Sequence, residues 1–147
     1  MHRISLITVG KIKTPWIQEG CSLYSDRLTH SCDFAEKVLS AGEAEEERER
    51  IKKAIDNAEG TVVVLDDRGK QFTSPELAGW IGKQRDNGTP VTFVIGGAYG
   101  LDDSIRSKAT LVLSLGKMTL PHELCKLVTL EQLFRAHAIL AGTGYHH

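Results

Sequence analysis

The chain has 147 residues, 41% of them hydrophobic and 25% charged, with a formal net charge of −1. This length suits one folded core, and the composition excludes a disordered polar chain. The odd number of cysteines, three without a CxxC pair, argues against a disulfide framework and a zinc site. Because no leader pattern opens the chain and no apolar run is long enough to span a membrane, we expect a cytoplasmic protein with reduced thiols.

The N-terminal segment predicts a strand followed by a helix. An apolar, β-rich run covers residues 4–9. Thr14 and Pro15 then open a helix, because proline fits the first helical turn. The apolar residues of this helix repeat at spacings of four, three and four: Ile17, Cys21, Tyr24 and Leu28.

A weaker strand, over residues 34–39, precedes the most charged segment of the chain. Residues 43–53, EAEEERERIKK, are typical of a solvated helix with charge pairs four residues apart, which we expect to end near Gly60. The alternative is a mobile arm that faces RNA.

The second half contains three strands that are apolar throughout, over residues 61–65, 91–95 and 111–113. Strands of this kind are buried on both faces, which is typical of a parallel sheet covered by helices. A capping box of Thr73 and Glu76 starts the intervening helix, and a short helix begins at Asp102 or Asp103. The sequence therefore predicts an α/β fold.

The last helix opens at Pro121, runs to about Leu140 and has Gly142 where a C-terminal cap belongs. Its apolar residues cover too much of the circumference for one stripe: Leu124, Leu127, Val128, Leu130, Leu133, Phe134, Ile139 and Leu140. We expect this helix to be buried in the core or shared with a second subunit.

Three loops leave the carboxyl ends of the predicted parallel strands, where ligands bind in open sheets: residues 65–70, 96–100 and 114–120. Their glycines let a ligand approach the backbone closely. The middle loop reads GGxxG rather than GxGxxG, so the dinucleotide fingerprint is absent. Without further information, a tight turn into the next helix explains the middle loop equally well, and a plain connection explains the last one better.

Polar side chains on and after the last helix are the candidates for chemistry. His122, in its first turn, is either a base or a structural hydrogen-bonding group. Arg135 lies among apolar residues and needs a partner if it is buried. Tyr145 and His146 close the chain together with His147, where a frayed end is the alternative.

These motifs resemble the RlmH family of the SPOUT superfamily, which are pseudouridine N3-methyltransferases of large-subunit ribosomal RNA. The matching residues stand in the same order along the whole chain: Leu65-Asp66-x-x-Gly69-Lys70, Phe93–Gly97 with Gly100-Leu101, Leu113-Ser114, Lys117–His122, Glu131–Ala136 and Tyr145-His146. Lys126, His147 and a short segment over residues 42–47 depart from the family pattern, and the first two bear on RNA contacts, since lysine does not replace the arginine fork.

The resemblance implies one domain over residues 1–147, with a deep trefoil knot within about 91–147, and a homodimer packed through the knot. It implies S-adenosylmethionine as cofactor and no metal. The cofactor contacts that it implies are Leu65, Gly96, Leu115, Gly116, Lys117, Met118, Thr119 and Leu120.

The implied reaction methylates N3 of a pseudouridine in 23S ribosomal RNA on the assembled ribosome. The implied catalytic residues are His146, Tyr145, Arg135 and His122, among which the sequence does not identify the base. The sequence lacks the fingerprint that a Rossmann oxidoreductase requires. A second alternative, a non-catalytic RNA-binding or assembly factor, can be distinguished from an enzyme only by cofactor titration. At this net charge, an RNA-binding chain needs its basic residues on one face or a partner subunit.

Overall fold

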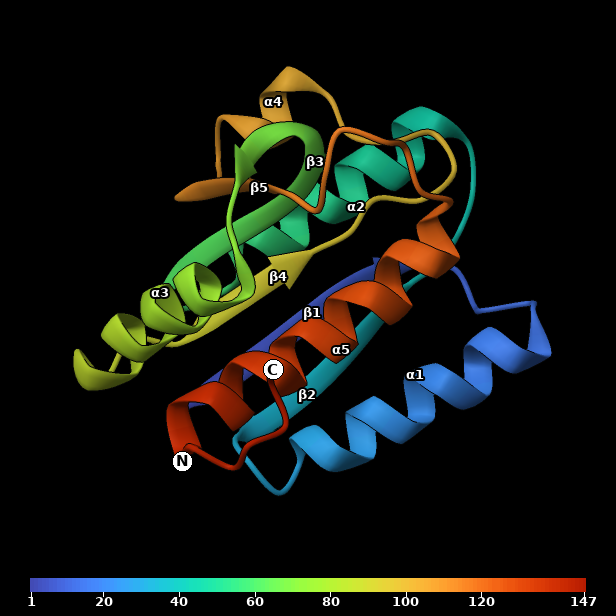
Figure 1. Ribbon diagram of the computed structural model, residues 1–147. Helices are drawn as coiled ribbons and strands as arrows, with labels where there is room; N and C mark the ends of the chain where they lie inside the picture. Colours follow the sequence, from blue (N-terminus) through green and yellow to red (C-terminus); the bar gives the residue numbers. More distant parts are fainter.

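The computed structural model describes all 147 residues. A single five-stranded sheet, with all its strands parallel in the order β2-β1-β4-β3-β5, forms the centre of the molecule (Figure 1). The strands are β1 (Arg3–Val9), β2 (Asp33–Leu39), β3 (Thr61–Gln71), β4 (Val91–Val94) and β5 (Leu111–Ser114). The helices are α1 (Pro15–Leu28), α2 (Ala44–Asp56), α3 (Ser74–Asp86), α4 (Asp103–Arg106) and α5 (His122–Ala141). The predicted parallel sheet flanked by helices is therefore confirmed.

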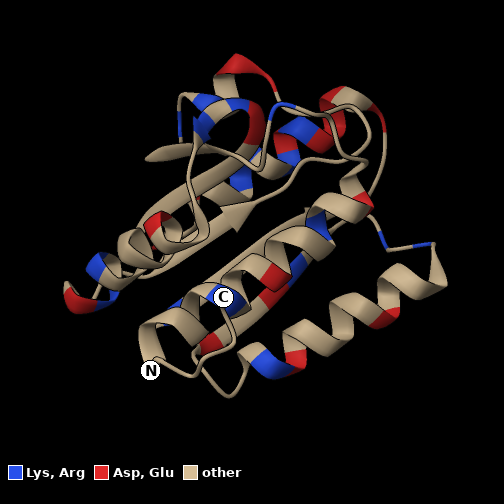
Figure 2. Ribbon diagram, viewed as in Figure 1, with Lys and Arg blue, Asp and Glu red and all other residues tan.

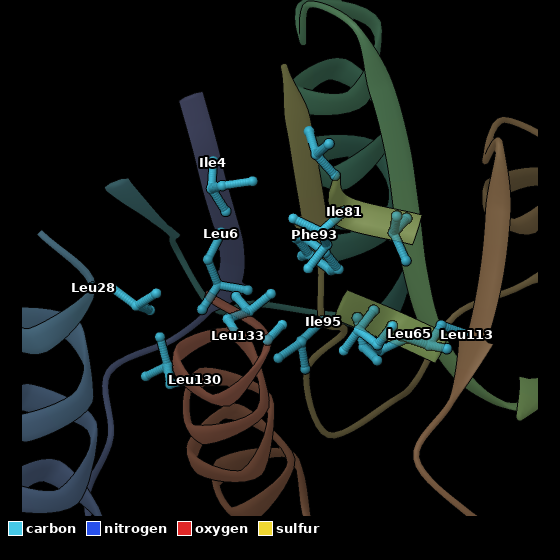
Figure 3. Packing of buried hydrophobic residues seen from close by; sticks show 14 of the residues in the cluster. Ile4, Leu6, Leu28, Leu65, Ile81, Phe93, Ile95, Leu113, Leu130 and Leu133 are labelled. Atoms are coloured by element: carbon cyan, nitrogen blue, oxygen red, sulfur yellow. The ribbon is translucent and has the colours of Figure 1, made fainter. Parts of the chain in front are cut away.

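Two helical layers cover the sheet, because successive side chains of a strand point to opposite faces. Ile4 and Leu6 of β1 pack with α1, α3 and α5, whereas Ile7 and Val9 pack with α2 and α4. Leu130 and Leu133 of α5 lie beside Leu6 in the larger cluster (Figure 3). This arrangement explains why the inner strands carry apolar residues that point to both faces.

Helix α5 lies on the sheet between α1 and α3 and packs against both (Figure 1). It begins after Pro121 and ends before Gly142, whose backbone is left-handed with φ at 67°. Both expected ends are confirmed. Three of its sides contact protein, which accounts for much of its all-round apolar character. None of the helices has both the length and the apolarity that a membrane crossing needs.

Two expected boundaries were wrong. The segment after Leu65 is not a free loop, because β3 continues to Gln71, and both Leu65 and Lys70 pair with Leu113 of β5. The residues between them bulge out, and at Gly69 an added Cβ would lie 2.5 Å from the Val112 carbonyl oxygen, so only glycine fits there. The charged helix α2 ends at Asp56 rather than near residue 60.

Candidate functional site

A pocket lies at the carboxyl edge of the sheet, where the three loops meet. It has a volume of about 630 Å³, within the usual range for small-molecule sites. Because β3, β4 and β5 are parallel, their carboxyl ends lie at one edge, and the first turn of α5 closes the pocket. In Figure 1 the loop after β4 (yellow) runs next to the loop before α5 (orange).

Seven of the eight residues implied as cofactor contacts line this pocket: Leu65, Gly96, Leu115, Gly116, Met118, Thr119 and Leu120. Lys117 does not, although both of its neighbours do, and its side chain is exposed. Leucines from β3 and from the loop before α5 give the pocket apolar walls. The pocket brings together residues that lie far apart in the sequence. Their roles in binding a cofactor stay predictions.

The loop before α5 offers unpaired hydrogen-bond donors to the pocket. No hydrogen bond within the chain engages the backbone N–H groups of residues 117–120, whereas the N–H of Gly116 donates to Ser114 Oγ at 3.1 Å. The first helical bond of α5 is donated by Cys125, and Pro121 supplies no side-chain cap. The N–H groups of the first turn of α5, at the pocket edge, are therefore also free for a polar or anionic group.

The glycine loop after β4 is held by contacts with α2 that the sequence did not reveal. A Cβ added at Gly97 would lie 2.6 Å from Oε1 of Glu47, a carboxylate that is buried on α2. The next residue, Arg48, donates a 3.1 Å hydrogen bond to the carbonyl of Tyr99. A Cβ at Gly96 would lie 2.9 Å from Leu101 Cδ2 of the same loop. Gly96 is thus required by the packing of its own loop, whatever ligand the pocket holds.

A largely buried ion pair joins two walls of the pocket. Arg106 of α4 donates to Asp66 Oδ2 at 2.8 Å and to the carbonyl of Leu101 at 2.9 Å. Burial alone would raise the pKa of Asp66, but hydrogen bonds from the Arg68 backbone and from Arg106 together outweigh it and hold that pKa below its ordinary value. The Asp66 carboxylate therefore stays ionised at neutral pH.

The four implied catalytic residues fall into two groups. His122 lines the pocket. Arg135, Tyr145 and His146 do not line it; they form a cluster with Glu131 farther along α5. Arg135 follows His122 by thirteen residues, a separation of about 20 Å along a helix axis. One chain therefore does not bring the two groups together.

Glu131, which sequence reasoning did not select, organises this cluster. Its Oε1 accepts from Arg135 Nη2 at 2.7 Å and from the Tyr145 hydroxyl at 3.1 Å. Arg135 Nη1 also lies 3.1 Å from His146 Nδ1. Since arginine has no acceptor, this hydrogen bond requires His146 Nδ1 to accept. The spacing of Glu131 and Arg135, four residues apart on a helix, was the available signal.

Burial, with hydrogen bonds to Tyr24 and Glu131, raises the pKa of Tyr145 to about 12. The Tyr145 phenol therefore keeps its proton at neutral pH and can act as a donor but not as a base. Its ring packs edge-on against Phe134, with centroids 4.9 Å apart, and beneath the Arg135 guanidinium at 4.8 Å. The end of the chain is thus tied to α5 in this structure rather than frayed.

Lys126, one of the departures from the family pattern, is buried, and its Nζ lies 3.7 Å from Glu36 Oε1 of β2. Its place is between α5 and the sheet, so the expectation that it bears on RNA contacts was wrong for this chain. No group of three or more His, Cys, Asp or Glu side chains is arranged to hold a metal ion.

Comparisons with known proteins agree with this geometry. A family model described as "Predicted SPOUT methyltransferase" matches residues 2–146. A relative from Nitratidesulfovibrio vulgaris (strain Miyazaki F), named "Ribosomal RNA large subunit methyltransferase H", is 42% identical, covering 100% of both chains. A protein of the same name from Geobacter metallireducens is 40% identical over 99% of each chain.

Among solved structures, a probable methylase family protein from Haemophilus influenzae has the same fold, with a TM-score of 0.59 at 11% identity, covering 99% of this chain and 71% of that one. The family-model match and the relatives both extend over essentially the whole chain. This chain belongs to the SPOUT methyltransferase family.

Proposed function

We propose that this chain is an S-adenosylmethionine-dependent methyltransferase that methylates N3 of a pseudouridine in large-subunit ribosomal RNA. The observation that carries the proposal is the pocket, in which three loops of a SPOUT-family chain combine apolar walls with free backbone donors. The relatives' name, ribosomal RNA large subunit methyltransferase H, supports the RNA class. The enzyme would act in the cytoplasm, on assembled ribosomes.

The residues of the pocket fit the cofactor. Its volume suits a nucleoside with an amino-acid side arm, and Leu65, Leu115 and Leu120 offer apolar surfaces to an adenine ring. The free N–H groups of residues 117–120 can bind the polar edge of that ring. A Cβ at Gly116 would meet no atom within 4 Å, so the backbone there faces open space.

When bound, S-adenosylmethionine supplies a sulfonium methyl group for in-line transfer to a nitrogen nucleophile. The chain contributes placement and a water-poor site. The acceptor nitrogen attacks well only after losing its proton. His122 is the one implied catalytic residue that lines the pocket, whereas His146 Nδ1 already accepts from Arg135 and Tyr145 keeps its proton.

The separation between the pocket and the Arg135 cluster supports a site built by two chains. We assign Arg135, Tyr145 and His146 to the pocket of the partner in a homodimer, where the guanidinium would stabilise negative charge on the deprotonated base. The outward face of α5, with half-buried Leu124 and Val128, is the surface we assign to this dimer. We also propose that the chain forms a deep trefoil knot within residues 91–147.

Calorimetric titration with S-adenosylmethionine and methylation of unmodified 70S ribosomes with labelled cofactor test the proposal. We expect binding, with transfer to one pseudouridine in 23S RNA. Gly96→Val should abolish binding, because its side chain would displace Leu101 and the loop. Gly79→Val is the matched control, since a Cβ there meets nothing within 4 Å. Ribosome binding without any cofactor binding would identify an assembly factor instead of an enzyme.

A further inference from the structure

We propose that the ring of Tyr99 is a stacking platform for a nucleobase of the RNA substrate at the mouth of the pocket. This inference rests on the proposed function. Tyr99 follows Ala98 and precedes Gly100, both of which line the pocket, but its own side chain does not line it. The side chain is 53% exposed, and it is one of few large apolar groups on the surface. The exposed ring therefore belongs to a residue flanked by pocket-lining residues and lies outside the volume assigned to the cofactor.

The loop that carries Tyr99 is fixed rather than mobile. The Tyr99 carbonyl accepts from Arg48 Nη2 at 3.1 Å, and the Gly100 N–H closes a turn on the Gly97 carbonyl at 3.0 Å. Gly97 in turn packs against the buried Glu47. These contacts tie the backbone of the loop to α2, so the backbone that carries the ring is positioned before RNA binds, which limits the order lost on binding.

The near-neutral net charge of the chain favours a contact of this kind over bulk attraction to phosphates. The net charge is −1, and Figure 2 shows Lys and Arg interspersed with Asp and Glu over the ribbon. Bulk attraction to phosphates is weak under these conditions. Proteins that act on RNA loops read unstacked bases by stacking them on aromatic rings, and a base that reacts must leave its stack. An aromatic ring at the pocket rim meets that requirement.

Steady-state methylation of unmodified 70S ribosomes tests the proposal with Tyr99→Ala, Tyr99→Phe and Trp16→Ala. Trp16 is the control because it is an exposed aromatic, at 62%, that does not line the pocket. We expect Tyr99→Ala to lower kcat/KM for ribosomes about tenfold, equivalent to about 1.4 kcal/mol, mainly through KM. Calorimetric affinity for S-adenosylmethionine and Tm should stay unchanged, and Tyr99→Phe should retain full activity because the ring, not the hydroxyl, stacks.

Three results would overturn the proposal: full activity of Tyr99→Ala, a parallel loss of cofactor affinity, or an equal loss in Trp16→Ala. If Tyr99→Phe loses as much activity as Tyr99→Ala, the hydroxyl rather than the ring makes the contact, and the stacking proposal is also refuted. If the unaltered chain does not methylate ribosomes, the proposed function fails and this inference fails with it. If the unaltered chain methylates and Tyr99→Ala does so equally well, only the stacking role is lost.

Discussion

His137 on α5 carries a buried imidazole, and protonation of this ring at acid pH opposes folding. Its Nδ1–H donates to the Leu133 carbonyl at 2.8 Å, while Nε2 is buried without any partner. Burial lowers the pKa of His137 below its ordinary value of 6.5. Below about pH 6.5, His137 therefore binds a proton more readily in the unfolded chain than in the folded chain. The full contribution of His137 to folding stability is present above that pH and is lost as the pH falls further.

We predict that acidification from about pH 7.5 to about pH 5.5 lowers the Tm of the unaltered protein more than that of His137→Leu. The leucine variant removes the titrating group while filling a similar apolar space. Thermal melts of both proteins at the two pH values, in buffers of equal ionic strength, measure the difference. Equal shifts in the two proteins would show that other groups carry the acid dependence.

At the level of single residues, part of the site could be predicted from the sequence and part could not. Seven of the eight residues implied as cofactor contacts line one pocket, and they could be selected because glycine and leucine in strand-ending loops form a recognisable motif. Glu47, Arg48 and Arg106 were missed because their partners lie in other elements, 51 residues away in the case of the Arg48 contact with Tyr99. A charged residue on a surface helix gives no sign in the sequence of the backbone carbonyl that it binds.

Among the elements, strands and long helices were predictable because their patterns are local. The alternation of β1 between two clusters and the ends of α5 at Pro121 and Gly142 follow from residue type and spacing. The continuation of β3 past Leu65 was not predictable, since it depends on a second pairing with Leu113 of β5. Polar residues such as those at 66–68 are typical of loops, and only the neighbouring strand makes them part of the sheet.

The ion pair between Asp66 and Arg106 links this irregular part of β3 to α4 and the glycine loop. We predict that Asp66→Asn lowers both the midpoint of urea unfolding and the affinity for S-adenosylmethionine at pH 7, because Arg106 loses its buried partner and no longer holds Leu101 in place. Since the pKa of Asp66 is lowered, the stability it contributes is present above about pH 4 and is lost as the pH falls further.

Urea titrations at several pH values, with calorimetry at pH 7, measure both effects. The control is Glu59→Gln, which breaks the exposed pair of Arg3 and Glu59 at 3.0 Å and should change neither quantity appreciably. The stability difference between Asp66→Asn and the unaltered protein should shrink below about pH 4. A difference that is constant with pH would mean that the substitution acts through packing rather than through the charge.

At the scale of the whole molecule, the position of the chain end argues for cooperation between two subunits. Tyr145 and His146 are fastened to Arg135 and Glu131, while the pocket lies at the other end of α5. If the site is shared, deleting residues 145–147 should leave cofactor affinity intact and lower turnover on ribosomes at least about tenfold. The deletion also removes the Tyr145 packing on Phe134, so its Tm is measured alongside.

Complementation between two defective chains separates a shared site from a site within one chain. One chain carries Gly96→Val, which damages the pocket, and the other lacks residues 145–147. On ribosomes, the Gly96→Val homodimer should be inactive, and the truncated homodimer should retain at most about a tenth of the unaltered turnover. Co-expression with two different affinity tags, followed by selection for both tags, yields heterodimers in which one of the two sites combines an intact pocket with an intact tail. These heterodimers should regain about half of the unaltered dimer's turnover. If they stay inactive while binding one equivalent of S-adenosylmethionine, the tail serves its own chain and the shared site is refuted.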